Sequence, residues 1–214
     1  MIAERRPFIT DRRLLAALEG QRYVVLRPPA HIVSLFREVQ SQFRAVLPAA
    51  VTYPAEPHVT LRGFPVGTDL TILRSVVATW ADSVPPLDLT IEDLSAFPPP
   101  HKVPILKIRR TRELVRAFVS LAGLASAAKL PEFPNVPSPD DWVFHLSIAY
   151  CLAVDDATWS AVSSLVASRA GITASCIVDH AELVDYDGGV EQLGGAYELL
   201  GIGSEGNTVR RTTG

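Results

Sequence analysis

An internal duplication is the feature of this sequence that most restricts its fold. His58 and His145 each lie in a short apolar strand pattern, and a helix start, Thr68 or Asp155, follows ten residues later (68 − 58 and 155 − 145). The next strand pattern begins 29 residues after the first histidine (87 − 58) and 27 after the second (172 − 145). A unit of strand, helix, histidine-bearing strand, helix and strand, repeated at this offset, predicts two similar lobes related by a pseudo-twofold axis. The two histidines should then face one another.

Hydrophobic periodicity and capping signals place the expected elements around these histidines. Residues 1–20 form an N-terminal extension with a short helix signal, residues 21–200 form one bilobal domain, and the polar residues 201–214 form a frayed, flexible tail. The repeats run from about 21 to 100 and from about 101 to 200, and an exchange of strands between the lobes stays open. The expected strands are 23–26, 57–64, 87–97, 104–108, 142–151 and several within 172–200, and the expected helices are 30–47, 69–82, 111–129 and 155–169.

Composition excludes several classes of protein. The chain has 214 residues, of which 48% are hydrophobic, so it can bury a substantial core and is not disordered as a whole. A net charge of −3 argues against nonspecific electrostatic binding along nucleic acid. An anionic ligand must therefore be bound by individual side chains at a local site. No apolar run is long enough to span a membrane, and we expect a soluble, cytoplasmic protein. Cys151 and Cys176 lack the spacing of a zinc or redox site and are expected in the core.

The two histidine strands carry the candidate chemistry. Because residues two apart on a strand share a face, His58 lies beside Thr60, and His145 lies beside Ser147. A hydroxyl can donate to a phosphate oxygen, and a histidine with an ordinary pKa of about 6.5 can exchange a proton near neutrality. Two opposed histidines can therefore divide the acid and base work of an in-line displacement at phosphorus, without a metal. A single such motif is weak, whereas two matched copies favour function.

Other candidates are less specific. Arg62 shares the face of His58 and Thr60 and can bind phosphate, although a solvated strand-end arginine fits the sequence equally well. The basic run from His101 to Arg116 can guide an RNA end, but such runs are more often solvated surfaces. Four aromatic residues are available for stacking on a base, namely Tyr23, Tyr53, Trp142 and Tyr150, although Tyr150 should point away from His145 by alternation, and the sequence singles out none of them. His31, His101 and His180 have no partner at the motif offset, and their default interpretation is structural or surface.

The two motifs, Pro57-His58-Val59-Thr60-Leu61 and Phe144-His145-Leu146-Ser147-Ile148, and the duplicated order around them, resemble the 2H phosphoesterase superfamily. This superfamily includes RNA 2′,3′-cyclic phosphodiesterases and 2′-5′ RNA ligases. The resemblance implies an α+β fold, bilobal and internally duplicated, with two mostly antiparallel sheets and flanking helices around a central cleft.

The resemblance also implies a function. His58 and His145 would be the catalytic pair, and Thr60 and Ser147 the phosphate ligands, with no metal and no cofactor. The expected partner is an RNA 3′ end or a small cyclic nucleotide, and the protein is expected to be a monomer. Hydrolysis of 2′,3′-cyclic phosphates is the first hypothesis. Nucleotide binding without turnover and 2′-5′ RNA ligation are the alternatives, and the sequence does not decide which histidine is the base.

Overall fold

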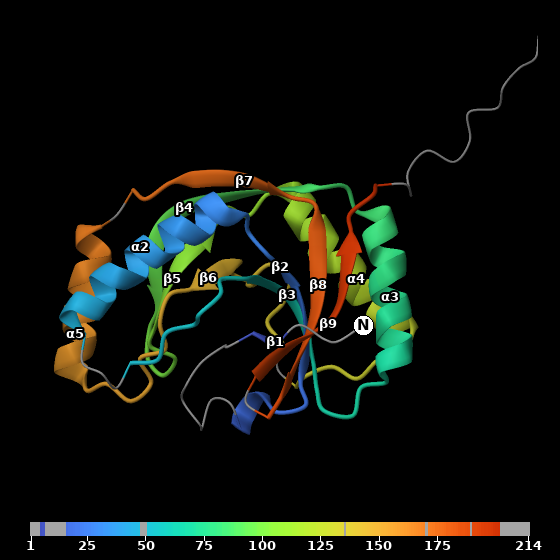
Figure 1. Cartoon of the computed structure of the whole chain (residues 1–214), viewed down its shortest axis with the longest axis horizontal. Helices are drawn as coiled ribbons and strands as arrows, with labels where there is room; N and C mark the ends of the chain where they lie inside the picture. Colours follow the sequence, from blue (N-terminus) through green and yellow to red (C-terminus); the bar gives the residue numbers. More distant parts are fainter. Residues whose placement is uncertain are drawn as a thin grey trace, which may run out of the picture.

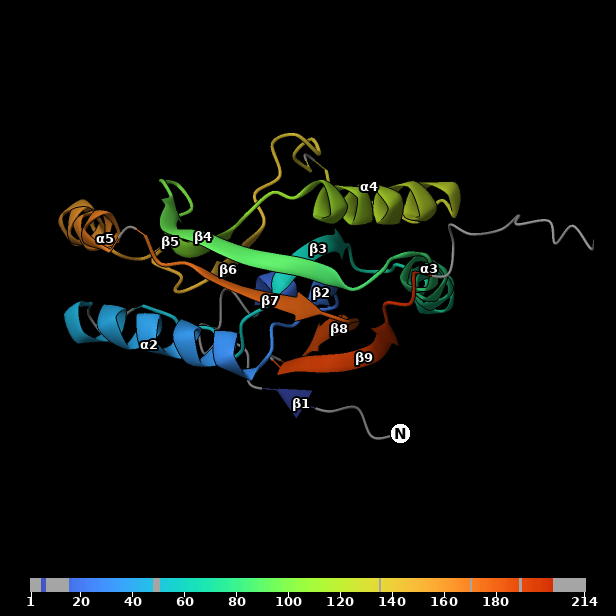
Figure 2. The same cartoon turned by 90° about the horizontal axis from the view of Figure 1, so that it is seen from above.

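The computed structural model describes residues 5–6, 16–47, 51–134, 136–169, 171–188 and 190–201. Helices and antiparallel strands pack in an α+β arrangement, as the resemblance implied (Figures 1 and 2). In chain order the elements are β1 (Arg5–Arg6), β2 (Arg22–Leu26), α2 (Ala30–Val46), β3 (Val59–Phe64), α3 (Leu70–Ser83), β4 (Leu87–Phe97), β5 (Val103–Ile108), α4 (Arg112–Ala127), β6 (His145–Ser147), α5 (Asp156–Ser168), β7 (Ala174–Val178), β8 (His180–Asp187) and β9 (Val190–Glu198). The order β2-α2-β3-α3-β4 recurs as β5-α4-β6-α5-β7, which is the duplicated unit expected from the sequence.

The strands form two antiparallel sheets. One has the order β1-β9-β8-β2-β3 and the other the order β6-β5-β4-β7. β4 comes from the first repeat but pairs with β5 and β7, while β8 and β9 complete the sheet of β2 and β3. β3 directly follows His58, and β6 begins at His145. Each of these strands is the last strand of its sheet, and the two strands contact each other.

The helices cover the sheets, and α3 and α5 begin at the capping residues that the sequence indicates. Asp69 accepts hydrogen bonds from the N–H groups of Thr71 and Ile72 at the start of α3, and Asp155 does the same for Thr158 at α5. α2 and α4 lie on opposite sides of the strands in Figure 2, and α3 packs against α4. At that contact the indole of the fully buried Trp80 donates to the Ala117 carbonyl at 2.8 Å.

The strand expected over 142–151 was predicted too long. Regular pairing covers only His145–Ser147, because the proline-rich segment before it makes no ladder and the chain changes partner after it. Tyr150 forms an isolated bridge with Thr52 instead, so the alternation that placed its side chain away from His145 does not extend this far.

The chain ends are described only in part. Residues 16–18 are helical, and the rest of the expected first helix lies outside the described residues. So does almost all of the expected tail, from residue 202 onward. Among the residues that the structure does describe, no helix is long and apolar enough to cross a membrane. Cys151 is buried in the core, and Cys176 is half-buried against it.

Candidate active site

The two histidines lie where the end strands of the two sheets meet. His58 immediately precedes β3, and His145 is the first residue of β6. Val59, Leu61 and Leu146, which alternate with the polar residues, are fully buried and anchor both strands in the core. The polar side chains therefore point to the opposite face, as the period of a strand requires.

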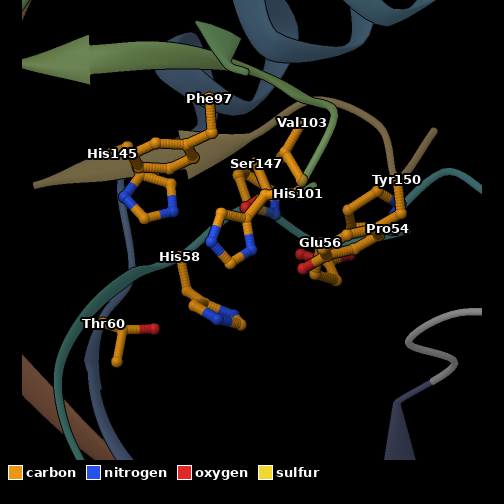
Figure 3. A pocket seen from close by; sticks show the side chains of 11 residues that line it. Pro54, Glu56, His58, Thr60, Phe97, His101, Val103, His145, Ser147 and Tyr150 are labelled. Carbon is orange, nitrogen blue, oxygen red and sulfur yellow. The ribbon is translucent and has the colours of Figure 1, made fainter. Parts of the chain in front are cut away.

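A cavity of about 360 Å³ opens on this face, and both motifs line it (Figure 3). The lining residues are Pro54, Glu56, Pro57, His58, Thr60, Phe97, His101, Val103, His145, Ser147 and Tyr150. The four motif side chains that the sequence singles out are thus brought together in one place. Two residues that sequence reasoning did not assign to the site, His101 and Tyr150, line the same cavity.

His145 is held in a defined tautomer. Its Nδ1 lies 2.7 Å from the Val143 carbonyl oxygen, which can only accept, so Nδ1 carries the proton. In the neutral ring Nε2 then has a free lone pair. Phe97 packs edge-on against the imidazole, with ring centroids 4.9 Å apart. Burial lowers the pKa of His145, and the hydrogen bond to Val143 only partly opposes this.

His58 has the opposite surroundings. Arg27 Nη1 lies 3.3 Å from its Nδ1, and because a guanidinium only donates, this contact requires a lone pair on Nδ1. The proton of the neutral ring is then on Nε2. Burial, followed by the charges of Arg27 and His145, lowers the pKa of His58 to about 3. The Glu191 carboxylate, 3.8 Å from Nδ1, therefore faces a neutral imidazole at neutral pH.

A buried charged network supports His58 from behind. Arg27, directly after β2, pairs with Glu182 of β8 at 2.9 Å and with Glu191 of β9. Glu191 is 2% exposed and also accepts a hydrogen bond from the Tyr186 hydroxyl at 3.1 Å. The partners of Arg27 lie 155 and 164 residues away in the sequence. Sequence reasoning missed this network, since no local pattern links residues at such separations.

The two hydroxyls of the motifs differ in their neighbours. Ser147 is hydrogen-bonded to the Tyr150 hydroxyl, and burial raises the pKa of that tyrosine, so it stays protonated. Thr60, across the cavity, also lines a second, adjoining cavity. The site therefore offers hydroxyl groups on both sides of the space between the histidines.

Arg62 lies in the second cavity and does not line the first. It is 7% exposed and pairs with Glu132 at 2.5 Å, so it is not a solvated strand-end arginine. The pairing of β2 with β3 is irregular here, because Val24 pairs with Arg62 and Val25 with Thr60, which leaves Leu61 as a bulge.

The basic run is largely occupied with structural partners. Lys102 binds Asp156 and the Val154 carbonyl, and Lys107 binds Glu92 at 2.8 Å. Arg110 donates to the Trp142 and Pro139 carbonyls and so fastens the segment before β6. Of the remaining histidines, His31 contacts the Ser175 carbonyl and His180 pairs with Asp179, both on the surface. Within the described ranges, no cluster of His, Cys, Asp and Glu has the arrangement of a metal site.

Comparison with known proteins identifies the family. The sequence model of the 2′-5′ RNA ligase superfamily matches residues 19–190, which include both histidine motifs. The chain belongs to the 2′-5′ RNA ligase superfamily, a group of 2H phosphoesterases. The resemblance noted from the two motifs is thereby confirmed.

Solved structures of this superfamily share the fold. TT0787 of Thermus thermophilus matches with a TM-score of 0.62 at 16% identity, over 85% of this chain and 98% of that one. Escherichia coli LigT complexed with 3′-AMP matches with a TM-score of 0.59 at 18% identity, over 84% and 98% of the two chains. Kluyveromyces marxianus Usb1 matches with a TM-score of 0.50 at 10% identity, over 83% and 99%. A comparison with the curated proteins gives no match.

Proposed function

We propose that this superfamily member hydrolyses 2′,3′-cyclic phosphates, at RNA ends or in cyclic nucleotides, with His58 and His145 as the acid and base. The observation that carries the proposal is the shared cavity, in which two imidazoles and the Thr60 and Ser147 hydroxyls surround one space. Hydrolysis of a cyclic phosphodiester requires positioning, charge stabilisation and two proton transfers, and these four side chains can supply each. The structure of LigT complexed with 3′-AMP supports a nucleotide as the ligand.

The tautomers divide the work between the histidines. Because Val143 holds the proton of His145 on Nδ1, its Nε2 lone pair can take a proton from the attacking water. His58 presents a proton on Nε2 and is the group that protonates the departing ribose oxygen. Bond formation from water oxygen to phosphorus then accompanies cleavage of the bond from phosphorus to that ribose oxygen, and a phosphomonoester is released.

Protonation of His58 before this step depends on the substrate. In the free protein the charged imidazole of His58 is disfavoured by burial and by Arg27. A bound phosphodiester brings a negative charge that favours the doubly protonated ring. The Glu191 carboxylate, at 3.8 Å, is then placed to accept from Nδ1 after a small displacement of Arg27. Thr60 and Ser147 would donate to the nonbridging oxygens, and no step in this scheme needs a metal.

A panel of nucleoside 2′,3′-cyclic phosphates, assayed with and without EDTA, tests the proposal. We expect turnover that persists in EDTA and falls by at least about 10²-fold in His58→Ala and in His145→Ala. His180→Ala, which removes a surface histidine outside the cavity, is the matched control. Loss of turnover in EDTA would exclude the metal-free scheme. Identification of the products separates hydrolysis from ligation, and binding without turnover would favour a nucleotide-binding module.

A further inference from the structure

A second cavity, of about 220 Å³, adjoins the histidine cavity, and Thr60 lines both. Its walls come from β2, β3 and the proline-rich segment before β6. The lining residues are Tyr23, Thr60, Arg62, Gly63, Phe133, Pro134, Val136, Pro137 and Trp142. A water molecule occupies roughly 30 Å³. The cavity therefore has room for a ligand group much larger than one or two waters, next to the proposed phosphate site.

Aromatic rings form two walls of this cavity. Tyr23 and Phe133 are stacked, with centroids 6.3 Å apart and an interplanar angle of 29°. Trp142 is supported by Phe118, whose ring centroid is 5.0 Å away. Gly63 makes the first wall possible, because a Cβ at that position would lie 2.8 Å from both the Phe133 and the Tyr23 ring. Rings held in this way suit a flat, aromatic ligand group.

Two residues of these walls carry a buried hydrogen-bond donor without an acceptor. Arg62 Nε and Trp142 Nε1 are buried, and neither has a hydrogen-bond partner among the described residues. Glu132 pairs with Nη2 of the Arg62 guanidinium and not with its Nε–H. A buried N–H without an acceptor destabilises the fold, so a ligand that reaches either group with an acceptor would be stabilised at this cavity.

We propose that the second cavity binds the nucleobase of the nucleotide whose phosphate lies at Thr60. A nucleobase is planar, stacks on aromatic side chains whatever its identity, and carries ring nitrogens or carbonyl oxygens that accept hydrogen bonds. The inference rests on the proposed function, since it takes the neighbouring histidine cavity as the phosphate site. Arg62 is then a base contact and not a phosphate ligand.

Calorimetric binding to a His145→Ala protein, which prevents turnover, tests the base site directly. The two ligands are adenosine 2′,3′-cyclic phosphate and a methyl riboside 2,3-cyclic phosphate, which has the same ring phosphate and no base. We expect tighter binding of the nucleotide. Phe133→Ala should reduce this preference by about 5- to 150-fold, the range for one base stack. Trp142→Phe keeps a ring but removes the N–H, and should reduce the preference by about 2- to 12-fold.

Two further variants guard against a general loss of structure. Trp159→Phe makes the same substitution on α5, at a residue that lines neither cavity, and should leave the preference unchanged. Gly63→Ala should displace the stacked rings and lower the preference as Phe133→Ala does. The base site is refuted if the base-free ligand binds as tightly as the nucleotide, if neither binds, or if the variants weaken both ligands equally.

The outcome separates the two proposals. Turnover is measured with native His145, and binding with His145→Ala, so each proposal has its own readout. Base-dependent binding without any hydrolysis by the native chain would contradict the proposed function and support the base site. Hydrolysis at equal rates with and without a base would contradict the base site alone.

Discussion

Acid should destabilise the folded chain through His58. The side chain is 14% exposed, and burial, followed by the charges of Arg27 and His145, lowers its pKa to about 3. In the unfolded chain the imidazole returns to its ordinary pKa of about 6.5. Between these values the unfolded state binds a proton that the folded state does not, so a fall in pH favours unfolding. The stabilisation is complete above pH about 6.5 and is lost progressively toward pH 3.

The size of the effect follows from the pKa difference. The free energy of unfolding falls by about 1.4 kcal/mol for each pH unit over which only the unfolded state holds the proton. At pH 5 the chain is about 1.5 units below the unfolded pKa, so His58 should cost about 2 kcal/mol. That is a large part of the roughly 5–15 kcal/mol by which a domain is stable.

Urea unfolding at pH 7 and pH 5 measures this cost. His58→Gln removes the titrating group, so the native chain should lose about 2 kcal/mol more than the variant between the two pH values. His31→Gln is the control, because it replaces an exposed histidine on α2, outside the histidine cavity. It should lose as much as the native chain. An equal loss in the native chain and in His58→Gln would refute the reasoning.

The remaining predictions concern the proposed reaction. Thr60→Ala and Ser147→Ala should each lower kcat by about 10²- to 10³-fold in a steady-state assay if the hydroxyls hold the nonbridging oxygens. Thr60→Ser keeps the hydroxyl, so its kcat should stay close to that of the native chain. Both limbs of the pH profile of kcat/KM should lie at lower pH than an ordinary histidine pKa of about 6.5 would give, because burial lowers the pKa of both histidines in the free protein. The alkaline limb of kcat, which reports the His58 acid in the complex, should lie higher, because a bound phosphodiester favours the protonated ring. Arg27→Met removes a charge that lowers the pKa of His58, so the His58 signal in an NMR titration should move to higher pH; no movement would exclude the Arg27 contact.

Sequence periodicity was sufficient to predict most helices and strands and which motif side chains share a face, whereas the fold class was implied by the resemblance to the family. Both predictions rest on local physics, because alternation on a strand and a capping residue before a helix are visible within a few residues. Asp69 and Asp155 do cap the helices that follow the two histidine strands. Thr60 lies on the cavity face with His58 because the strand is regular up to that point.

Other parts of the site depend on contacts that no local pattern records. The Arg62 side chain was predicted to share the face of His58 and Thr60; it lines the second cavity together with Thr60 but not the histidine cavity, next to a bulge that the sequence did not indicate. His101 reaches the histidine cavity from the turn between β4 and β5. Tyr150 reaches it because β6 ends at Ser147. Each case reflects irregular backbone, where side-chain direction no longer follows a period.

The duplication predicts two equivalent histidines, whereas the proposed reaction requires two different ones. A perfect pseudo-twofold would give two equivalent histidines, whereas an in-line displacement needs one acid and one base. The surroundings of the two rings differ: a backbone carbonyl fixes His145, while Arg27 and the β9 carboxylate of Glu191 lie beside His58, and Arg27 also pairs with Glu182 of β8. Arg27 lies in the first repeated unit, but its carboxylate partners lie on β8 and β9, which extend only the sheet of β3, so part of the asymmetry comes from strands outside the β2–β4 and β5–β7 units. In the proposed reaction this fixes how the substrate binds, with the attacking water toward His145 and the departing ribose oxygen toward His58.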